Sequence, residues 1–131
     1  TLLLVLILVL VLIFNSDKLY TSVNYTLLIF TLLLGLFLGL QILRRFYISF
    51  LIILIPFFIV NGILTGSFIP EPVVWYNNLE NLGIRLFTIP IEDIGYAFNM
   101  LFLVVFLYEK FKKSSNSLLR LKLYSNLLIS F

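Results

Sequence analysis

The sequence predicts an all-α protein, a bundle of about four transmembrane helices, because it is too apolar for a water-soluble fold. Hydrophobic residues make up 62% of the 131 residues, charged residues make up 11%, and the mean hydropathy is +1.15. A soluble globular chain is about 45–50% apolar and about 25% charged. Lipid offers the backbone no hydrogen-bond partners, so spanning segments are helices or closed barrels. Long apolar runs without alternation favour helices.

Four apolar runs give the predicted helices, which cover residues 1–14, 23–43, 46–64 and 88–108. The first is shorter than the ~20 residues of a full span. It begins with Thr and has no basic residue before it, so it does not fit a signal peptide. We expect it to be the end of a truncated helix, with further sequence upstream. The third run contains Pro56, which predicts a kink. The fourth contains Pro90 in its expected first turn, where proline's missing N–H is harmless.

Basic residues predict the orientation of these helices. Arg44 and Arg45 lie between the second and third predicted helices, and five more basic residues follow the fourth: Lys110, Lys112, Lys113, Arg120 and Lys122. Basic residues accumulate in cytoplasmic loops. We therefore expect the Arg44–Arg45 turn and the C-terminal tail to be cytoplasmic, and the 65–83 connection to face the other side. The net charge of +3 then reflects topology, and no nucleic-acid partner is expected.

Two regions are expected: a transmembrane domain over residues 1–110 and a basic cytoplasmic tail over residues 111–131. The tail carries four leucines that would face lipid if it formed an amphipathic interfacial helix: Leu118, Leu119, Leu121 and Leu123. A frayed tail fits the composition equally well.

Several chemistries are not expected from this composition. The chain has no Cys and no His, which excludes disulfides and thiolate or imidazole chemistry. It also lacks a glycine-rich phosphate loop and a His/Cys metal-binding pattern, so no metal site is expected. Gly35 and Gly39 form a GxxxG pattern in an apolar run, which favours close helix packing.

Polar and charged residues gather in one part of the chain, residues 61–93, and this part holds four of the six carboxylates. A connection of about 20 residues is usually a binding loop or a disordered linker. Its aromatic and apolar residues argue against disorder. The alternative is an ordinary interfacial loop, in which Trp75 and Tyr76 form an aromatic belt.

Glu92 and Asp93 are adjacent acids near the start of a hydrophobic helix, which indicates a functional site. Glu92, Tyr96 and Asn99 follow the helical spacing i, i+4 and i+7, so we expect one polar face that points inward. Arg85 is expected to keep one nearby carboxylate ionised while the other carboxyl keeps its proton. Such a pair would do acid and base work. The alternative is a simple interaction of the acids with the helix dipole.

Five segments in this order resemble the lycopene cyclase domain, the membrane-integral carotenoid cyclase family of bacteria, archaea and fungi. They are Asn61-Gly-Ile-Leu-Thr-Gly66, Pro72-Val-Val-Trp-Tyr-Asn77, Asn81-Leu-Gly-Ile-Arg85, Ile89-Pro-Ile-Glu-Asp93 and Leu107-Tyr-Glu109. The resemblance runs from about Asn15 to Glu109 and is densest over residues 61–93.

The resemblance implies a half-enzyme. In that family two similar three-helix domains, fused or separate, each carry a Pro-x-Glu-Glu/Asp motif and together convert lycopene to β-carotene. This chain is similar to the second domain, with its motif at Pro90 to Asp93 and an Asp where Glu is often found. The implied partners are lycopene, the lipid bilayer, and a first cyclase domain or a second copy of the chain. The implied location is a bacterial-type inner membrane.

The implied reaction is redox-neutral, so neither FAD nor NAD(P) nor any other cofactor is expected. Glu92 and Asp93 would serve as acid and base, with Glu71 in reserve. Trp75, Tyr76 and Tyr96 would stabilise the carbocation. The loop would be ordered, and the protonation of the carboxyls set, by Asn61, Asn77, Asn81 and Arg85. Asn99 would be a further supporting residue of the site.

Two other classes of protein remain open on the residues alone. A small ion- or proton-translocating subunit would also place acids and an Arg in the membrane, and an assembly subunit would use the GxxxG face without a catalytic site. Ion passage needs polar residues along a whole helix, whereas here the segment Leu103 to Phe106 closes one end with apolar side chains. A blind, lipid-facing pocket fits this pattern better.

Overall fold

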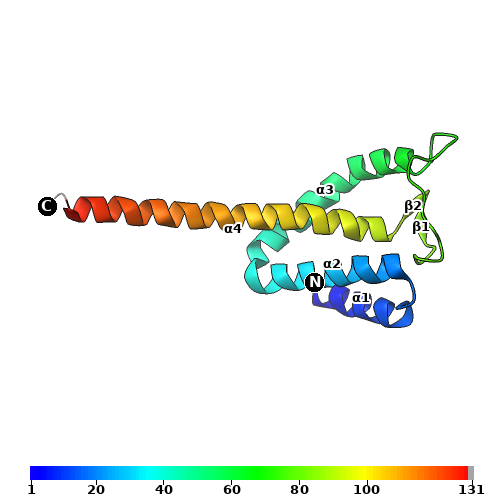
Figure 1. Ribbon diagram of the computed structural model, residues 1–131, viewed down its shortest axis with the longest axis horizontal. Coiled ribbons are helices and arrows are strands. Elements are labelled where there is room, and N and C mark those ends of the chain that lie inside the picture. Colours follow the sequence, from blue (N-terminus) through cyan, green and yellow to red (C-terminus); the bar gives the residue numbers. More distant parts are fainter. Residues whose placement is uncertain (130–131) are drawn as a thin grey trace.

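The computed structural model describes the backbone of residues 1–129 and the side chains of residues 1–118. In this described part the chain forms four helices and one short hairpin (Figure 1). The elements are α1 (Leu2–Phe14), α2 (Leu19–Leu38), α3 (Leu40–Leu64), β1 (Arg85–Leu86), β2 (Ile89–Pro90) and α4 (Glu92–Ile129). Three of them are long and apolar enough to cross a membrane: α2, α3 and the Glu92–Leu118 part of α4. The predicted helical membrane fold is confirmed.

The turn between α2 and α3 lies earlier than predicted. It falls at Gly39, so Arg44 and Arg45 belong to the second turn of α3 rather than to a loop. Gly39 fits this position because a Cβ there would lie 2.7 Å from the ring of Phe106. The expected boundary was wrong because the apolar run continues through Gly39 without a polar break. Arg44 and Arg45 are therefore helical residues near the start of α3.

The start of α4 lies later than predicted. Pro90 is in β2, where it pairs with Arg85 across the two-stranded hairpin, and α4 begins at Glu92. Phe87 adopts a positive φ of 57° in the turn of this hairpin. The expected placement of Pro90 in the first helical turn was therefore wrong. The hairpin instead delivers Glu92 and Asp93 directly to the first turn of α4.

The predicted tail continues α4 as helix as far as Ile129. The expectation that Leu119, Leu121 and Leu123 face lipid concerns side chains outside the described residues. A position in the membrane interface stays a prediction.

The core of the bundle is a column of phenylalanines between α3 and α4. Phe50 and Phe98 meet edge to face with ring centroids 5.1 Å apart, and Phe102 is fully buried. Such edge-to-face pairs are favoured by the charge distribution of aromatic rings. Gly35, the first glycine of the GxxxG pattern, lies against Phe102, so the pattern does form a packing face. This column fixes α4 against α2 and α3.

The 65–84 loop and the hairpin cover one end of the bundle, where α2 begins, α3 ends and α4 begins (Figure 1). The loop is held by backbone hydrogen bonds: the carbonyl of Leu64 accepts from Val73 and Val74, and the carbonyl of Glu80 accepts from Tyr20 and Thr21. This end holds four of the six carboxylates of the chain: Glu71, Glu80, Glu92 and Asp93. The opposite end carries the α2–α3 turn and the projecting part of α4.

Candidate active site

Two adjacent carboxyls in the first turn of α4 are the centre of the site. Glu92 is 0% exposed and Asp93 is 4% exposed. Burial of a carboxyl in an apolar bundle is costly unless its oxygens are hydrogen-bonded or it is protonated. The partners of each oxygen therefore decide what each carboxyl can do.

Asp93 receives three hydrogen bonds from three different segments. The Tyr20 hydroxyl from α2 donates to Oδ1 at 2.6 Å, and the Tyr76 hydroxyl from the loop donates to Oδ2 at 2.7 Å. The Asn61 side-chain amide from α3 also donates to Oδ2, at 2.9 Å. An ionised carboxylate only accepts hydrogen bonds, so three converging donors suit the charged form. The Asp93 side chain thus ties α2, α3 and the loop together.

The phenol of Tyr76 is suited to remain a donor. Burial first, and then the hydrogen bond to Asp93, raise the pKa of the Tyr76 hydroxyl above its ordinary value. It stays protonated at physiological pH and donates to the carboxylate. Its ring lies 5.6 Å from the ring of Tyr20, so both aromatic faces lie beside Asp93.

Glu92 has a different environment, although it is the neighbouring residue. Its Oε1 accepts from the Thr21 hydroxyl and from the backbone N–H of Leu82, both at 2.7 Å. Its Oε2 is buried and has no hydrogen-bond partner in the described structure. An unpartnered buried oxygen costs less as part of a neutral carboxyl than as part of a charged one. The Glu92 environment therefore favours a protonated acid.

A polar seam continues from Glu92 between α2 and α4. The Asn24 amide donates to the backbone carbonyl of Glu92 at 2.9 Å, and the Asn99 amide approaches the carbonyl of Asn24 at 3.4 Å. The side-chain oxygens of both asparagines are buried without a partner in the described part of the chain. Asn99 therefore lies on the inner face of α4, as predicted.

Tyr96 does not share that face. It is 54% exposed, whereas Gly95 is buried against Asn24 and Leu28 of α2. The face that packs against α2 is thus Glu92, Gly95 and Asn99, at spacings i, i+3 and i+7. Tyr96 follows Gly95, so on an ideal helix its side chain is rotated by about 100° from the direction of Gly95 and points outward. The expectation that Tyr96 points into the site was wrong.

Arg85 braces the loop and does not pair with a carboxylate. Its guanidinium donates to the Thr88 carbonyl at 2.7 Å and to the Asn78 side-chain oxygen at 2.6 Å, and it lies over the Tyr76 ring at 5.8 Å. We expected Arg85 to keep a nearby carboxyl ionised, but among the described residues it forms no ion pair with Glu92 or Asp93. The hairpin directs the Arg85 side chain across the loop, so its contacts position Tyr76.

The other residues predicted for the site lie in the loop and differ in burial. Asn81 is buried and accepts from the N–H of Gly83, which shapes the approach to Leu82. Asn77 accepts from the N–H of Leu79 in an exposed turn. Glu71 is exposed, and Trp75 is 78% exposed. Neither of these two is among the hydrogen-bond partners of the carboxyl pair in the described residues.

Three residues of the site carried no prediction: Tyr20, Thr21 and Asn24. All three come from the first turns of α2, where Thr21 and Asn24 are buried and Tyr20 is half-buried. A signal was present, because polar residues are frequent over 20–26, at the start of the second apolar run. Only the packing of α2 on α4 brings them to Glu92 and Asp93, from which they are separated by 68 to 73 residues in sequence.

A model of the lycopene cyclase family matches residues 17–111, which contain every hydrogen-bond partner of the two carboxyls. The chain belongs to the lycopene cyclase family. Membership supports a role for this lycopene cyclase family protein in carotenoid cyclisation, at a membrane that its three long apolar helices can span. No curated protein and no solved structure matches the chain.

Proposed function

We propose that this chain is a lycopene β-cyclase, or one half of one, which converts the ψ-ends of lycopene to β-rings. Its membership of the lycopene cyclase family supports the substrate class. The proposed partners are a first cyclase domain, as an upstream half or a separate subunit, or a second copy of the chain. The proposed location is a multi-pass position in a bacterial-type inner membrane.

The reaction requires one acid and one base and moves no net electrons. A proton adds to C2 of the terminal C1=C2 bond and leaves a cation at C1. The C5=C6 double bond attacks this cation, which forms the C1–C6 bond and moves the positive charge to C5. Loss of the C6 proton then creates the C5=C6 bond of the β-ring. Each proton gained is balanced by one lost, so no redox cofactor is required.

The observation that carries the proposal is the asymmetry of the two adjacent carboxyls. Glu92 has an unpartnered, buried Oε2 that suits a protonated acid, and Asp93 is surrounded by donors that suit a carboxylate base. Neighbouring carboxyls whose environments favour opposite protonation states form an acid–base pair. We assign the first proton transfer to Glu92 and the final proton removal to Asp93.

The aromatic faces that stabilise the cation are best assigned to Tyr20 and Tyr76. Both rings lie beside Asp93, with centroids 5.6 Å apart. A positive charge over an aromatic face is stabilised without forming a covalent bond. Trp75 and Tyr96, which the sequence suggested for this role, are exposed away from the buried pair.

An apolar hollow on the outer side of α3 offers the ψ-end a route from the lipid. The hollow has a volume of about 400 Å³ and is lined by Ile53, Pro56, Phe57, Val60, Asn61 and Leu64. Asn61 is its polar lining residue and also donates to Asp93. A hydrocarbon chain would meet apolar side chains until it reached the site. Both carboxyls are buried, so the ψ-end gains contact with them when the loop moves or when the partner domain docks.

A purely structural role of the site is the rival interpretation, and one observation favours it: Asp93 ties three segments together. A translocating subunit is less well supported, because the half of α4 beyond Asn99 is lined by Phe102 and Phe106. A structural carboxylate explains the partners of Asp93. It does not explain the unpartnered oxygen of Glu92, because a carboxyl with a free oxygen adds little to a hydrogen-bonded frame.

The test is pigment analysis in lycopene-accumulating cells that express the chain with and without a first cyclase domain. We expect β-rings only where Glu92 and Asp93 are intact. Glu92→Gln keeps the size of the side chain and its Oε1 acceptor but removes the acid, and should lower the rate by about 10²–10⁴-fold. Asp93→Asn should lower it similarly.

The matched control is Glu109→Gln, about midway along α4, which should be nearly silent when variants are compared at equal amounts of folded protein. If Glu92→Gln kept full cyclisation while Glu71→Gln abolished it, the chemistry would belong to the exposed loop and not to α4. If none of these variants changed cyclisation, the structural interpretation of the site would be correct.

A further inference from the structure

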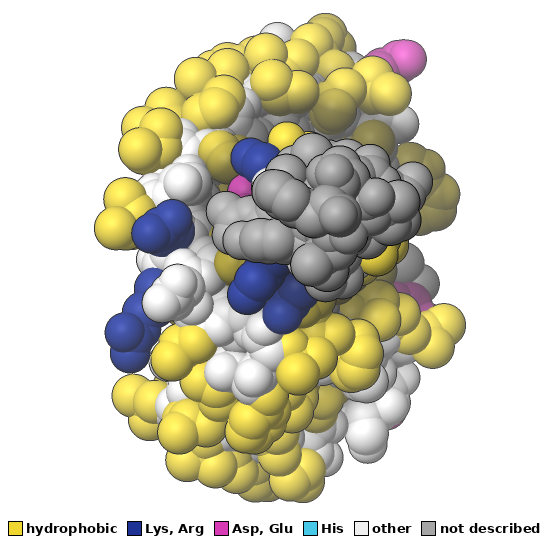
Figure 2. Space-filling view, turned by 90° about the vertical axis from the view of Figure 1, so that its left-hand side faces the viewer, with side chains coloured by type: hydrophobic (Ala, Val, Ile, Leu, Met, Phe, Trp, Pro, Cys, Tyr) yellow, Lys and Arg dark blue, Asp and Glu magenta, His cyan; other side chains and the backbone are white. Residues whose placement is uncertain are grey.

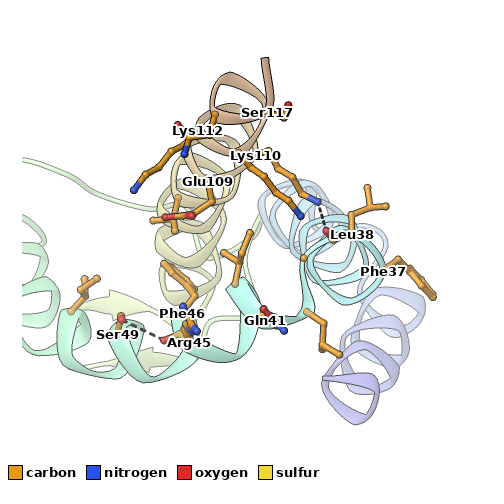
Figure 3. A pocket seen from close by; sticks show the side chains of 17 residues that line it. Phe37, Leu38, Gln41, Arg45, Phe46, Ser49, Glu109, Lys110, Lys112 and Ser117 are labelled. Atoms are coloured by element: carbon orange, nitrogen blue, oxygen red, sulfur yellow. Dashed lines mark hydrogen bonds between the residues drawn. The ribbon is translucent and has the colours of Figure 1, made fainter. Parts of the chain in front are cut away.

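A large basic hollow lies at the end of the bundle opposite the carboxyl pair. Its volume is about 1150 Å³, and its walls come from the end of α2, the first turns of α3 and the part of α4 beyond Val105 (Figure 3). The cyclisation chemistry does not involve this end, which is separated from Glu92 by the phenylalanine column of the core.

The hollow combines an apolar floor with a basic rim. Phe46, Ile53 and Val105 contribute apolar lining, and four cationic side chains line it together with a single carboxylate. The cations are Arg45 from α3 and Lys110, Lys112 and Lys113 from α4, and the carboxylate is Glu109. The rim therefore has an excess of positive charge, which favours an anionic ligand.

Two of the lysines already have structural contacts. The Lys110 ammonium donates to the Leu38 carbonyl at the end of α2, shown by a dashed line in Figure 3, and lies over the Phe106 ring. The Lys112 ammonium lies over the Tyr108 ring at 5.7 Å. Arg45 and Lys113 form no ion pair among the side chains that the structure describes. Their N–H groups are the ones available to a ligand, and they come from two different helices.

The surroundings of the hollow indicate a lipid headgroup rather than a soluble anion. Apolar side chains beside it are exposed on the outer surface of the helices, including Phe37 at 76% and Leu38 at 60%. Figure 2 looks onto this end and shows Lys and Arg side chains at mid-height, from its left edge inward, with apolar side chains above and below them. The hollow thus lies where the apolar surface of the spans meets the charged end. Basic pockets between helices at this level are suited to anionic lipid headgroups.

We propose that this hollow binds the phosphate headgroup of an anionic phospholipid. Arg45 and Lys113 hold the phosphate oxygens by charge-assisted hydrogen bonds, and the glycerol and upper acyl region lies on the apolar floor. The lipid then connects α3 to α4 at the end where Lys110 already connects α4 to α2. Occupancy stabilises the packing of the three spanning helices.

The test uses the full chain purified in detergent, with phosphatidylglycerol, phosphatidylcholine or inorganic phosphate added. Native mass spectrometry measures bound lipid, and thermal unfolding measures its effect on stability. We expect phosphatidylglycerol to remain bound and to raise the unfolding midpoint, with little effect from the other two additions. An equal effect of phosphatidylcholine would overturn the role of charge, and an equal effect of inorganic phosphate would overturn the role of the lipid.

Charge variants locate the site. Arg45→Gln and Lys113→Gln should each weaken phosphatidylglycerol binding roughly fivefold, the equivalent of about 1 kcal/mol for one basic residue at an anionic surface. Glu109→Gln should strengthen it, because this change removes the carboxylate from the rim. Lys18→Gln is the matched control, since it removes a basic residue at the other end of α2. If Lys18→Gln weakened binding as much as Lys113→Gln, the effect would be a general one of net charge and the proposed site would be wrong.

Discussion

At the scale of single residues, the chain places two chemically identical groups side by side in different surroundings. Successive side chains of a helix point in directions about 100° apart. Asp93 therefore faces the hydroxyls of Tyr20 and Tyr76, whereas Glu92 faces Thr21 and the backbone of Leu82. A difference in direction becomes a difference in hydrogen bonding, which is the physical basis for the proposed division between acid and base.

Tyr20→Phe should impair both stability and cyclisation while leaving the aromatic ring in place. The change removes the 2.6 Å donor to Asp93, and hydrogen bonds to charged groups contribute about 1.5–3 kcal/mol. Thermal unfolding in detergent measures the first effect, and β-ring formation per folded protein measures the second. Tyr96→Phe is the control, because the Tyr96 side chain is mostly exposed. Equal effects of the two substitutions would contradict the assigned role of Tyr20.

At the scale of the elements, the loop provides the cap that α2 itself lacks. Lys18, at the N-cap position, makes no side-chain capping hydrogen bond. Glu80 takes over this function: its carboxylate accepts from the N–H of Leu19, and its backbone carbonyl accepts from Tyr20 and Thr21. The first turn of α2 carries Tyr20, which donates to Asp93, and Thr21, which donates to Glu92. The loop therefore positions the site by fixing the start of a helix.

Glu80→Ala should loosen the first turn of α2 and slow cyclisation. Loss of an N-terminal cap costs about 0.5–2 kcal/mol. Amide hydrogen exchange at Leu19 should become faster, and the rate of cyclisation should fall because Tyr20 and Thr21 are held less firmly. Asp17→Ala separates capping from general electrostatics, since Asp17 also carries a negative charge near the start of α2 but is exposed. If hydrogen exchange at Leu19 were unchanged in Glu80→Ala, the backbone carbonyl of residue 80 alone would be enough to hold the first turn of α2, and the Glu80 side chain would not be the cap.

At the scale of the whole molecule, charge is divided between the two ends of the bundle. The buried acids lie at the end covered by the loop, and the cations of α3 and α4 lie at the other end. Helix α3 connects the two ends with 25 residues, a length of about 37 Å at 1.5 Å per residue. This exceeds the ~30 Å thickness of the hydrocarbon core. The geometry is compatible with a loop on one side of the membrane and a basic end on the other.

Single-cysteine labelling tests the proposed topology directly, because the chain has no cysteine of its own. The positive-inside rule places the basic end in the cytoplasm. A membrane-impermeant thiol reagent added outside intact cells should therefore modify Glu71→Cys, in the exposed loop. It should modify Arg44→Cys, in the second turn of α3, only after the membrane is permeabilised. The reverse pattern would invert the topology and place the site on the cytoplasmic side.

The sequence by itself determined the class of the protein and its long spans, and it singled out the acid motif as the candidate site. Apolar character is a property of each residue that adds along a segment, so hydropathy alone identifies spanning helices without knowledge of their neighbours. The same local reasoning identified Glu92 and Asp93, since adjacent carboxyls are conspicuous in an apolar chain. It also singled out Gly35 and Gly39 as close-packing positions, although only Gly35 lies within α2 and Gly39 lies in the turn after it.

Only the tertiary structure decided which side chains meet the carboxyls. Tyr20 and Asp93 are 73 residues apart, and no local pattern encodes a contact at that separation. Gly95 can face α2 because it lacks a Cβ, and this rotates Tyr96 outward despite its suitable helical spacing. Pro90 could begin a helix, but pairing with Arg85 places it in a hairpin. In each case packing between distant segments selected one of several locally acceptable arrangements, and that selection set the surroundings of Glu92 and Asp93.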